Sequence, residues 1–301
     1  MKILFNRRPI LGPWGGGTKV LSAIIEECEL RGHEVIFEEQ ICFQYDIDVL
    51  FCMDPRPIQT IDFHQLLSYK KNHPKAKLLQ RVGDLGTHGK PELLELVKAS
   101  SQLADVLIFP SKWARDYLSS SKDSYVISNA PLSKFLIKKT NKTFSEKIKI
   151  VSHHWSNNSL KGFEIYEQLD DYCSTSNADF CFIGRKPEDL ILNNYIPPQD
   201  IEGLINLLPS HDVYVTASKQ EAGANHVLEA MALGLPVLYH KDGGSINEYC
   251  ENFGLQYENF EDLIYILKSK KDFLQSLASK MSYSRSSTDM AKEYVNLFES
   301  L

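Results

Sequence analysis

Residues 213–238 read VYVTASKQEAGANHVLEAMALGLPVL, and their order of apolar and polar positions decides the fold. The stretch opens and closes with short apolar runs that favour strands. Between them a helical pattern begins near Ala224 and ends near Gly234, and glycine commonly terminates helices. A strand, a loop, a helix and a second strand in this order form the unit from which parallel sheets are built.

The same alternation continues in both directions along the chain. Short apolar runs alternate with longer amphipathic patterns, which is typical of open parallel sheets with helices on both faces. We therefore predict an α/β protein of the doubly wound type. The expected strands include residues 3–5, 35–37, 49–52, 78–79, 106–109, 126–127, 148–151, 180–183, 213–215 and 236–238.

A break in this rhythm marks a domain boundary. Residues 129–146 contain Pro131, several lysines and few periodic apolar positions. We expect a first Rossmann-like domain at residues 1–140 and a second at residues 141–283, the two facing a central cleft. Ligands of such sheets bind at the carboxyl ends of the strands.

The last segment of the chain predicts one more helix. Its apolar residues share one face, and the second domain's strands are already covered by earlier helices. We therefore expect residues 284–301 to return to the first domain. The residues on the apolar face are Met290, Tyr294, Val295 and Phe298.

Composition excludes several classes of protein. The 301 residues include 33 Lys and Arg against 39 Asp and Glu, a net charge of −6, which argues against nucleic-acid binding. No apolar window is long enough for a membrane span, and we expect a cytoplasmic protein with reduced cysteines. Lysines in residues 69–77 suggest peripheral contact with the inner face of a membrane, with a solvated surface as the alternative.

Two glutamates and a lysine carry the candidate chemistry. Glu221 lies on the loop before the helix of the opening stretch, and Glu229 lies within that helix. Backbone N–H groups at the start of a helix favour an anionic diphosphate, and a carboxylate accepts hydrogen bonds from ribose hydroxyls. Lys161 follows the second domain's first strand, where it can hold a diphosphate. The alternative is an ordinary amphipathic helix and a solvated lysine.

The opening stretch resembles the Glu-x7-Glu signature of retaining nucleotide-sugar glycosyltransferases with the GT-B fold, and the closest group is glycosyltransferase family four. The likeness covers nearly the whole chain, because further segments match the family in the expected order. These segments are residues 12–18, 31–35, 104–111, 126–129, 161–163 and 182–185.

The resemblance implies transfer of a hexose-type sugar from a nucleotide diphosphate sugar to the hydroxyl of a glycan, lipid-linked or polysaccharide acceptor. It implies no cofactor and no metal. Glu229 would bind ribose, Lys161 the diphosphate and Glu221 the sugar. The other residues implied are Gly15, Gly16, Gly17, Arg185, Gly223, Ala224, Asn225 and His226 at the donor, catalytic His88, and Arg81 and Asp84 on the acceptor side.

Other interpretations remain open or are weaker. A GT-B-shaped nucleotide-sugar epimerase and a non-catalytic sugar-nucleotide-binding subunit are the alternatives. A dehydrogenase is disfavoured because residues 15–20 lack the last glycine of the dinucleotide fingerprint. Asp46 and Asp48 resemble an Asp-x-Asp metal site, but they precede a strand, so we propose no metal there.

Overall fold

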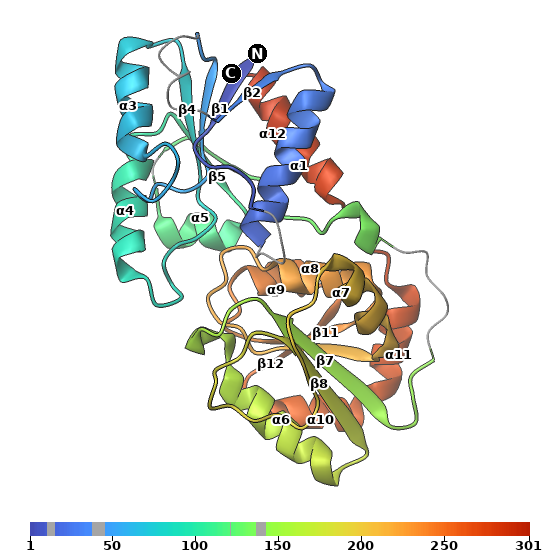
Figure 1. The fold of residues 1–301 in the computed structure, drawn as a ribbon. Coiled ribbons are helices and arrows are strands. Elements are labelled where there is room, and N and C mark those ends of the chain that lie inside the picture. The colour runs from blue at the N-terminus through green and yellow to red at the C-terminus, as the bar shows by residue number, and fades with distance from the viewer. Residues whose placement is uncertain (11–15, 38–45, 121, 137–142) are drawn as a thin grey trace. The chain divides into compact units, whose positions relative to one another are not determined.

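The computed structural model describes residues 1–10, 16–37, 46–120, 122–136 and 143–301, and it divides into two compact units (Figure 1). Each unit contains a parallel sheet with six described strands. The first sheet has the order β2-β1-β3-β4-β5-β6. Its strands are β1 (Lys2–Phe5), β2 (Glu34–Ile36), β3 (Val49–Cys52), β4 (Lys77–Arg81), β5 (Val106–Phe109) and β6 (Ser124–Val126).

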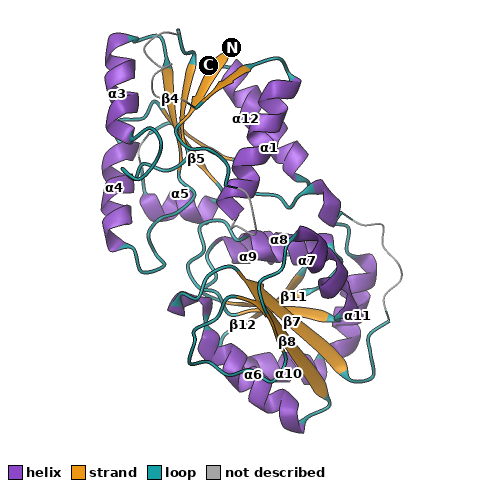
Figure 2. Cartoon of the chain, in the orientation of Figure 1, coloured by secondary structure: helices purple, strands orange, loops and turns teal. Residues whose placement is uncertain are grey.

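Helices cover both faces of the first sheet, with α3 and α4 on one side and α1 and α12 on the other (Figure 2). Local sequence fixes where some of them begin. Asp62 and Gln65 form a capping box at the start of α3, and Ser111 accepts a hydrogen bond from the Ala114 N–H at the start of α5. The helices are α1 (Gly16–Leu30), α3 (Phe63–Asn72), α4 (Pro91–Ser101), α5 (Lys112–Leu118) and α12 (Ser287–Glu299).

The last helix, α12, belongs to the first unit and packs beside α1 (Figure 1). Tyr294 and Phe298 are fully buried, and their rings contact Phe51 of β3 at centroid distances of 5.9 and 5.2 Å. Arg31 at the end of α1 forms an ion pair with Glu299. The end of the chain therefore completes the core formed by its beginning.

The second sheet has the order β12-β11-β10-β7-β8-β9. Its strands are β7 (Ile148–His154), β8 (Ala178–Gly184), β9 (Tyr195–Ile196), β10 (Val213–Thr216), β11 (Val237–His240) and β12 (Gly254–Tyr257). Its helices are α6 (Phe163–Thr175), α7 (Ile201–Leu207), α8 (Asn225–Ala232), α9 (Ser245–Cys250), α10 (Phe260–Ser269) and α11 (Lys271–Lys280). Three short 3-10 turns are η1 (Ser133–Phe135), η2 (Ser159–Lys161) and η3 (Leu208–Ser210).

Alternate residues of the central strands build two separate cores in this unit. Ile150 and Phe182 pack with α6 and α10, whereas the next residues, Val151 and Ile183, pack with α8 and α9. Successive side chains of a strand point to opposite faces, and both faces of a parallel sheet are covered. Continuous apolar runs are therefore the correct pattern for these strands.

The predicted α/β fold class is confirmed, and the sequence analysis missed only short strands such as β9 and β12. The chain passes between the units after Ala130 and after Ser286, whereas we expected boundaries at 140 and 283. The first difference has a physical cause, because Phe135 of η1 is fully buried in the second unit's core.

We predict that Phe298→Ala destabilises the protein by about 3–5 kcal/mol, because it leaves a cavity between α12 and β3. Urea unfolding followed by circular dichroism measures the loss. Lys292→Ala, on the exposed side of the same helix, should change the free energy of unfolding by less than about 0.5 kcal/mol. Equal effects of the two substitutions would contradict the packing described here.

Candidate active site

The loop after β10 holds Glu221 in a fixed backbone position. Gln220 adopts a left-handed conformation with φ of +53°, which is strained for a residue other than glycine. The Glu221 N–H donates to the Gly243 oxygen at 3.2 Å, and the Ser245 N–H donates to the Glu221 oxygen at 2.8 Å. Gly244 has φ of +70°, and a Cβ there would lie 2.6 Å from the Glu221 oxygen. Glycine is therefore required where the two loops meet.

A second glycine brings Lys161 to the same place. Gly162 has φ of +74°, and a Cβ there would lie 2.5 Å from the Ala217 oxygen. The Lys219 N–H donates to the Leu160 oxygen at 2.8 Å, which joins the turn η2 to the loop after β10. Lys161 Nζ then meets Glu221 Oε1 at 2.5 Å. The structure thus brings together two residues that lie 60 positions apart and were singled out by sequence.

The Lys161–Glu221 pair lies near a buried cluster of three histidines, His153, His154 and His226. The two side chains are 12% and 14% exposed. Below them, His226 bonds Thr216 Oγ1 through Nε2 at 3.0 Å. Burial, and then the charge of Lys161, lowers the pKa of His226 from 6.5 to about 3. The imidazole is therefore neutral at physiological pH and adds no second cation to the site.

Glu229 is enclosed rather than open to a ligand. Its side chain is 1% exposed, and Oε2 lies 2.9 Å from Nε2 of His153, which is itself buried. The other ring nitrogen of His153 has no hydrogen-bond partner in the described part of the chain. The ribose-binding role of Glu229 stays a prediction, because the carboxylate here contacts a protein group.

The remaining residues predicted at the donor differ in their exposure and in their hydrogen bonds. Asn225 is the first residue of α8, and Gly223 and Asn225 are half-buried. The Ala224 N–H already donates to Ser245 Oγ at 3.1 Å, so this donor is engaged. Arg185 directly follows β8 and is exposed, with its backbone N–H bonded to the His154 oxygen. These positions lie in the second unit, and their roles stay predictions.

The first unit contains the other predicted residues. Gly16 and Gly17 open α1, whereas Gly15 lies outside the described residues. His88 is half-buried in the loop between β4 and α4. Burial opposes the charge of Asp84 there, but the hydrogen bond and charge of Lys90 hold the pKa of Asp84 below its ordinary value.

Arg81 serves the interior of the first unit. It is 5% exposed, and its guanidinium donates to Tyr294 Oη at 3.2 Å and to Asn129 Oδ1 at 2.8 Å. The sequence suggested an acceptor-side role, but these contacts join the end of β4 to α12 and to Asn129, near the end of this stretch of the first unit. Direct contact of Arg81 with an acceptor stays a prediction.

Sequence reasoning missed the residues that fix the backbone of the site. Gly162, Gln220 and Gly244 set the loop geometry, and His153 supplies the partner of Glu229. A signal was present for Gly244, because the pair Gly243-Gly244 lies in the loop shortly after the expected strand at 236–238. His153 follows the apolar run at 148–151 and was visible only as one of two adjacent histidines.

The lysine-rich residues 69–77 are partly engaged with the protein. Tyr69 is buried and stacks on His73 at 4.0 Å, and Lys70 forms an ion pair with Asp105 at 2.6 Å. Lys75 and Lys77 line a surface cavity of about 650 Å³ at the amino-terminal edge of the first sheet. In the described part of the chain, every helix is too short or too polar to cross a bilayer. Membrane contact through these lysines stays a prediction.

No protein-family model matches the chain, and no curated protein resembles it in sequence. Its fold is nevertheless similar to that of solved glycosyltransferases. The HepE protein of Anabaena in complex with UDP-glucose superposes with a TM-score of 0.71 at 14% identity, over the whole of both chains. Sucrose-phosphate synthase from Thermosynechococcus elongatus gives the same TM-score and identity, over 99% of this chain and 98% of that one.

A longer protein shares the fold as well. The pneumococcal O-GlcNAc transferase GtfA, solved with UDP and GlcNAc, superposes with a TM-score of 0.63 at 10% identity. The match covers 87% of this chain but only 59% of GtfA. At these identities the likeness is one of fold, and the expected pair of Rossmann-like units of the GT-B type is confirmed.

We predict that Gly162→Ala destabilises the protein by about 1–3 kcal/mol, because its positive φ and the nearby Ala217 oxygen leave no room for a methyl group. Thermal or urea unfolding provides the measurement. Gly17→Ala is the matched control, since a Cβ there meets no atom within 4 Å. An unchanged stability in Gly162→Ala would show that the loops do not approach as described.

We predict that acidification weakens the protein through His226. A group with a lowered folded pKa gives its full stability above the unfolded value of 6.5 and loses it as the pH falls toward 3. Between pH 7 and pH 5, the difference in unfolding free energy between wild type and His226→Gln should shrink by about 2 kcal/mol. Urea unfolding at each pH tests this. The same measurement on His64→Gln, a substitution of an exposed histidine of α3, is the control.

Proposed function

We propose that this protein is a retaining glycosyltransferase that moves a hexose-type sugar from a nucleoside diphosphate donor to an acceptor hydroxyl. The observation that carries the proposal is the contact between Lys161 Nζ and Glu221 Oε1 at 2.5 Å. It supports a site in which a cation and an acid meet beside the start of α8, at the carboxyl ends of β7 and β10. Ligands of parallel sheets bind at this edge.

In the proposed reaction, Lys161 binds the diphosphate of the donor. The bond between the anomeric carbon and the phosphate oxygen breaks, and its electron pair stays on the diphosphate. A lysine stabilises this negative charge as a fixed point charge, a role that a metal ion plays in other transferases. Metal independence is part of the proposal for this reason.

Glu221 orients the sugar in this scheme. Its backbone is held by Gly243 and Ser245, so its carboxylate can accept hydrogen bonds from sugar hydroxyls when Lys161 turns to the diphosphate. The acceptor oxygen bonds to the anomeric carbon on the face that the diphosphate leaves. The acceptor proton passes to the departing phosphate oxygen, so retention needs no separate base.

Glu229 is assigned to the ribose of the donor. Because its carboxylate is bonded to His153 in the structure, ribose binding requires that contact to be shared or exchanged. We predict that Glu229→Gln mainly raises the donor KM, by about tenfold or more, and changes kcat less. Unchanged donor KM in a correctly folded variant would remove Glu229 from the donor site.

We predict that Lys161→Ala lowers kcat by about a hundredfold or more, because the leaving diphosphate loses its cation. The assay incubates the protein with a panel of nucleotide sugars, with and without acceptors, and measures free nucleotide and glycosylated product. Lys149→Ala, at an exposed position near the amino-terminal end of β7, is the matched control and should keep wild-type rates.

The same assay separates the alternatives. An epimerase changes the donor sugar in the absence of an acceptor, and a non-catalytic subunit binds a nucleotide sugar without turnover. Either result would overturn the proposed transfer. Transfer with wild-type kcat in Lys161→Ala would retain the function but reject the site.

A further inference from the structure

Three of the chain's eight arginines lie at the carboxyl edge of the first sheet. Arg7 follows β1, Arg56 follows β3, and Arg81 ends β4. β3 pairs with both β1 and β4, so these three chain segments are neighbours. The net charge of −6 gives no hint of this local concentration of positive charge.

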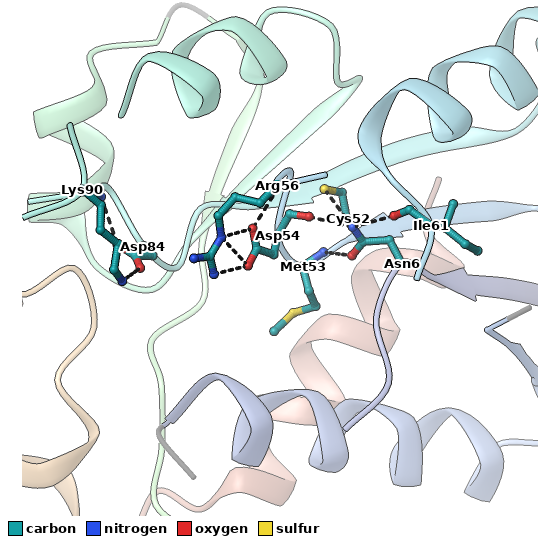
Figure 3. Close-up of polar contacts among 9 residues, drawn as sticks. Asn6, Cys52, Met53, Asp54, Arg56, Ile61, Asp84 and Lys90 are labelled. Carbon is teal, nitrogen blue, oxygen red and sulfur yellow. Dashed lines mark hydrogen bonds and ion pairs between the residues drawn. The ribbon is translucent and has the colours of Figure 1, made fainter. Parts of the chain in front are cut away.

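The described acids of the neighbouring loops, Asp54 and Asp84, are already engaged. Asp54 binds Arg56 through both oxygens, with Arg56 Nε at 3.0 Å from each and Nη2 at 2.5 Å from Oδ2. Asp84 binds Lys90 Nζ at 2.7 Å (Figure 3). Each of these carboxylates thus offsets a cation of its own loop, and the charge of Asp54 also acts on Arg7.

Arg81 is a buried cation and Arg7 a half-buried one. Arg81 is 5% exposed and is bonded only to the neutral groups of Tyr294 and Asn129 among the described residues. Arg7 is half-buried and forms no hydrogen bond or ion pair with any described residue. Burial lowers the pKa of Arg7, the charge of Asp54 opposes this change, and Arg56 and Arg81 lower the pKa further. Charges in such surroundings are costly unless an anion pairs with them.

The backbone around Arg7 is held rigidly by its neighbour Asn6. The Asn6 side chain is fully buried, and Nδ2 donates to the Asp54 oxygen at 2.7 Å and to the Ile61 oxygen at 3.3 Å. Oδ1 accepts from the Met53 N–H at 2.8 Å (Figure 3). These bonds join the end of β1 to the loop after β3. Arg7 and the Asp54–Arg56 pair are thereby kept at one site.

We propose that Arg7, together with Arg56 of the loop after the neighbouring strand β3, binds an anionic group of the acceptor, a phosphate or a carboxylate. Guanidinium groups match the oxygens of both anions through paired N–H donors. The anion would supply negative charge in addition to that of the described acids Asp54 and Asp84, which are already paired. That the anion belongs to an acceptor rests on the proposed function, whereas the existence of the anion site does not.

Arginine NMR tests the anion site without any transfer reaction. The full-length protein with ¹⁵N-labelled arginine is titrated with inorganic phosphate, with methyl phosphate and with the neutral methyl glucoside. The Nε–H signals of Arg7 and Arg56, assigned from Arg7→Gln and Arg56→Gln, should move saturably with both phosphates and stay fixed with the glucoside. Arg7→Gln should weaken the phosphate response of Arg56 by about tenfold.

Two variants guard this test against misfolding and general charge effects. Arg7→Lys keeps the charge and should retain part of the affinity, whereas Arg115→Gln removes an exposed arginine of α5 and should leave the affinity unchanged. An Arg7 signal that does not respond to phosphate, or an equal loss in Arg115→Gln, would overturn the anion site.

Transfer kinetics distinguish the two sources of such an anion. If the acceptor supplies it, Arg7→Gln raises KM about tenfold for an acceptor that carries a phosphate or carboxylate. The KM values for a neutral acceptor and for the donor stay unchanged. A raised donor KM assigns the anion to the donor and overturns the proposal. Absence of transfer with every donor overturns the proposed function instead, while the phosphate titration still decides the anion site.

Discussion

Gly162 and Ala217 lie so close that no side chain fits between them, and the geometry of the second unit's site depends on this approach. It brings the turn η2 against the loop after β10, so that Lys161 and Glu221 meet although they come from different strand ends. Gly244 provides a similar contact on the other side of Glu221. Both contacts are steric, because they depend on the absence of a Cβ rather than on an attractive group.

Much of the fold was predictable because each buried strand is a short continuous apolar run. The helix expected from Ala224 to Gly234 is α8, and Lys161 and Glu221, which the sequence analysis singled out, contact each other in the structure. The enclosure of Glu229 was not predictable, because its partner His153 lies 76 positions away on another strand.

Arg81 shows a further limit of sequence reasoning. A polar residue at the end of a strand indicates a ligand site, but here it binds Tyr294 of the last helix, 213 positions away. Whether a polar residue such as Arg81 points to solvent or into the protein depends on tertiary packing, which a local sequence pattern does not contain. The same reason hid the group of Arg7, Arg56 and Arg81, since its members come from three separate segments of the chain.

The return of α12 to the first unit has a consequence for biosynthesis. Among the described residues, the second unit is one stretch, Pro131–Ser286, whereas the first unit also needs Ser287–Leu301. A chain emerges from the ribosome N-terminus first, so the residues of the second unit are all synthesised before those of the first unit are complete. The first sheet is synthesised earliest. The face that Tyr294 and Phe298 cover nevertheless stays exposed until residues 287–301 have emerged. The order of completion is therefore the reverse of the order of synthesis.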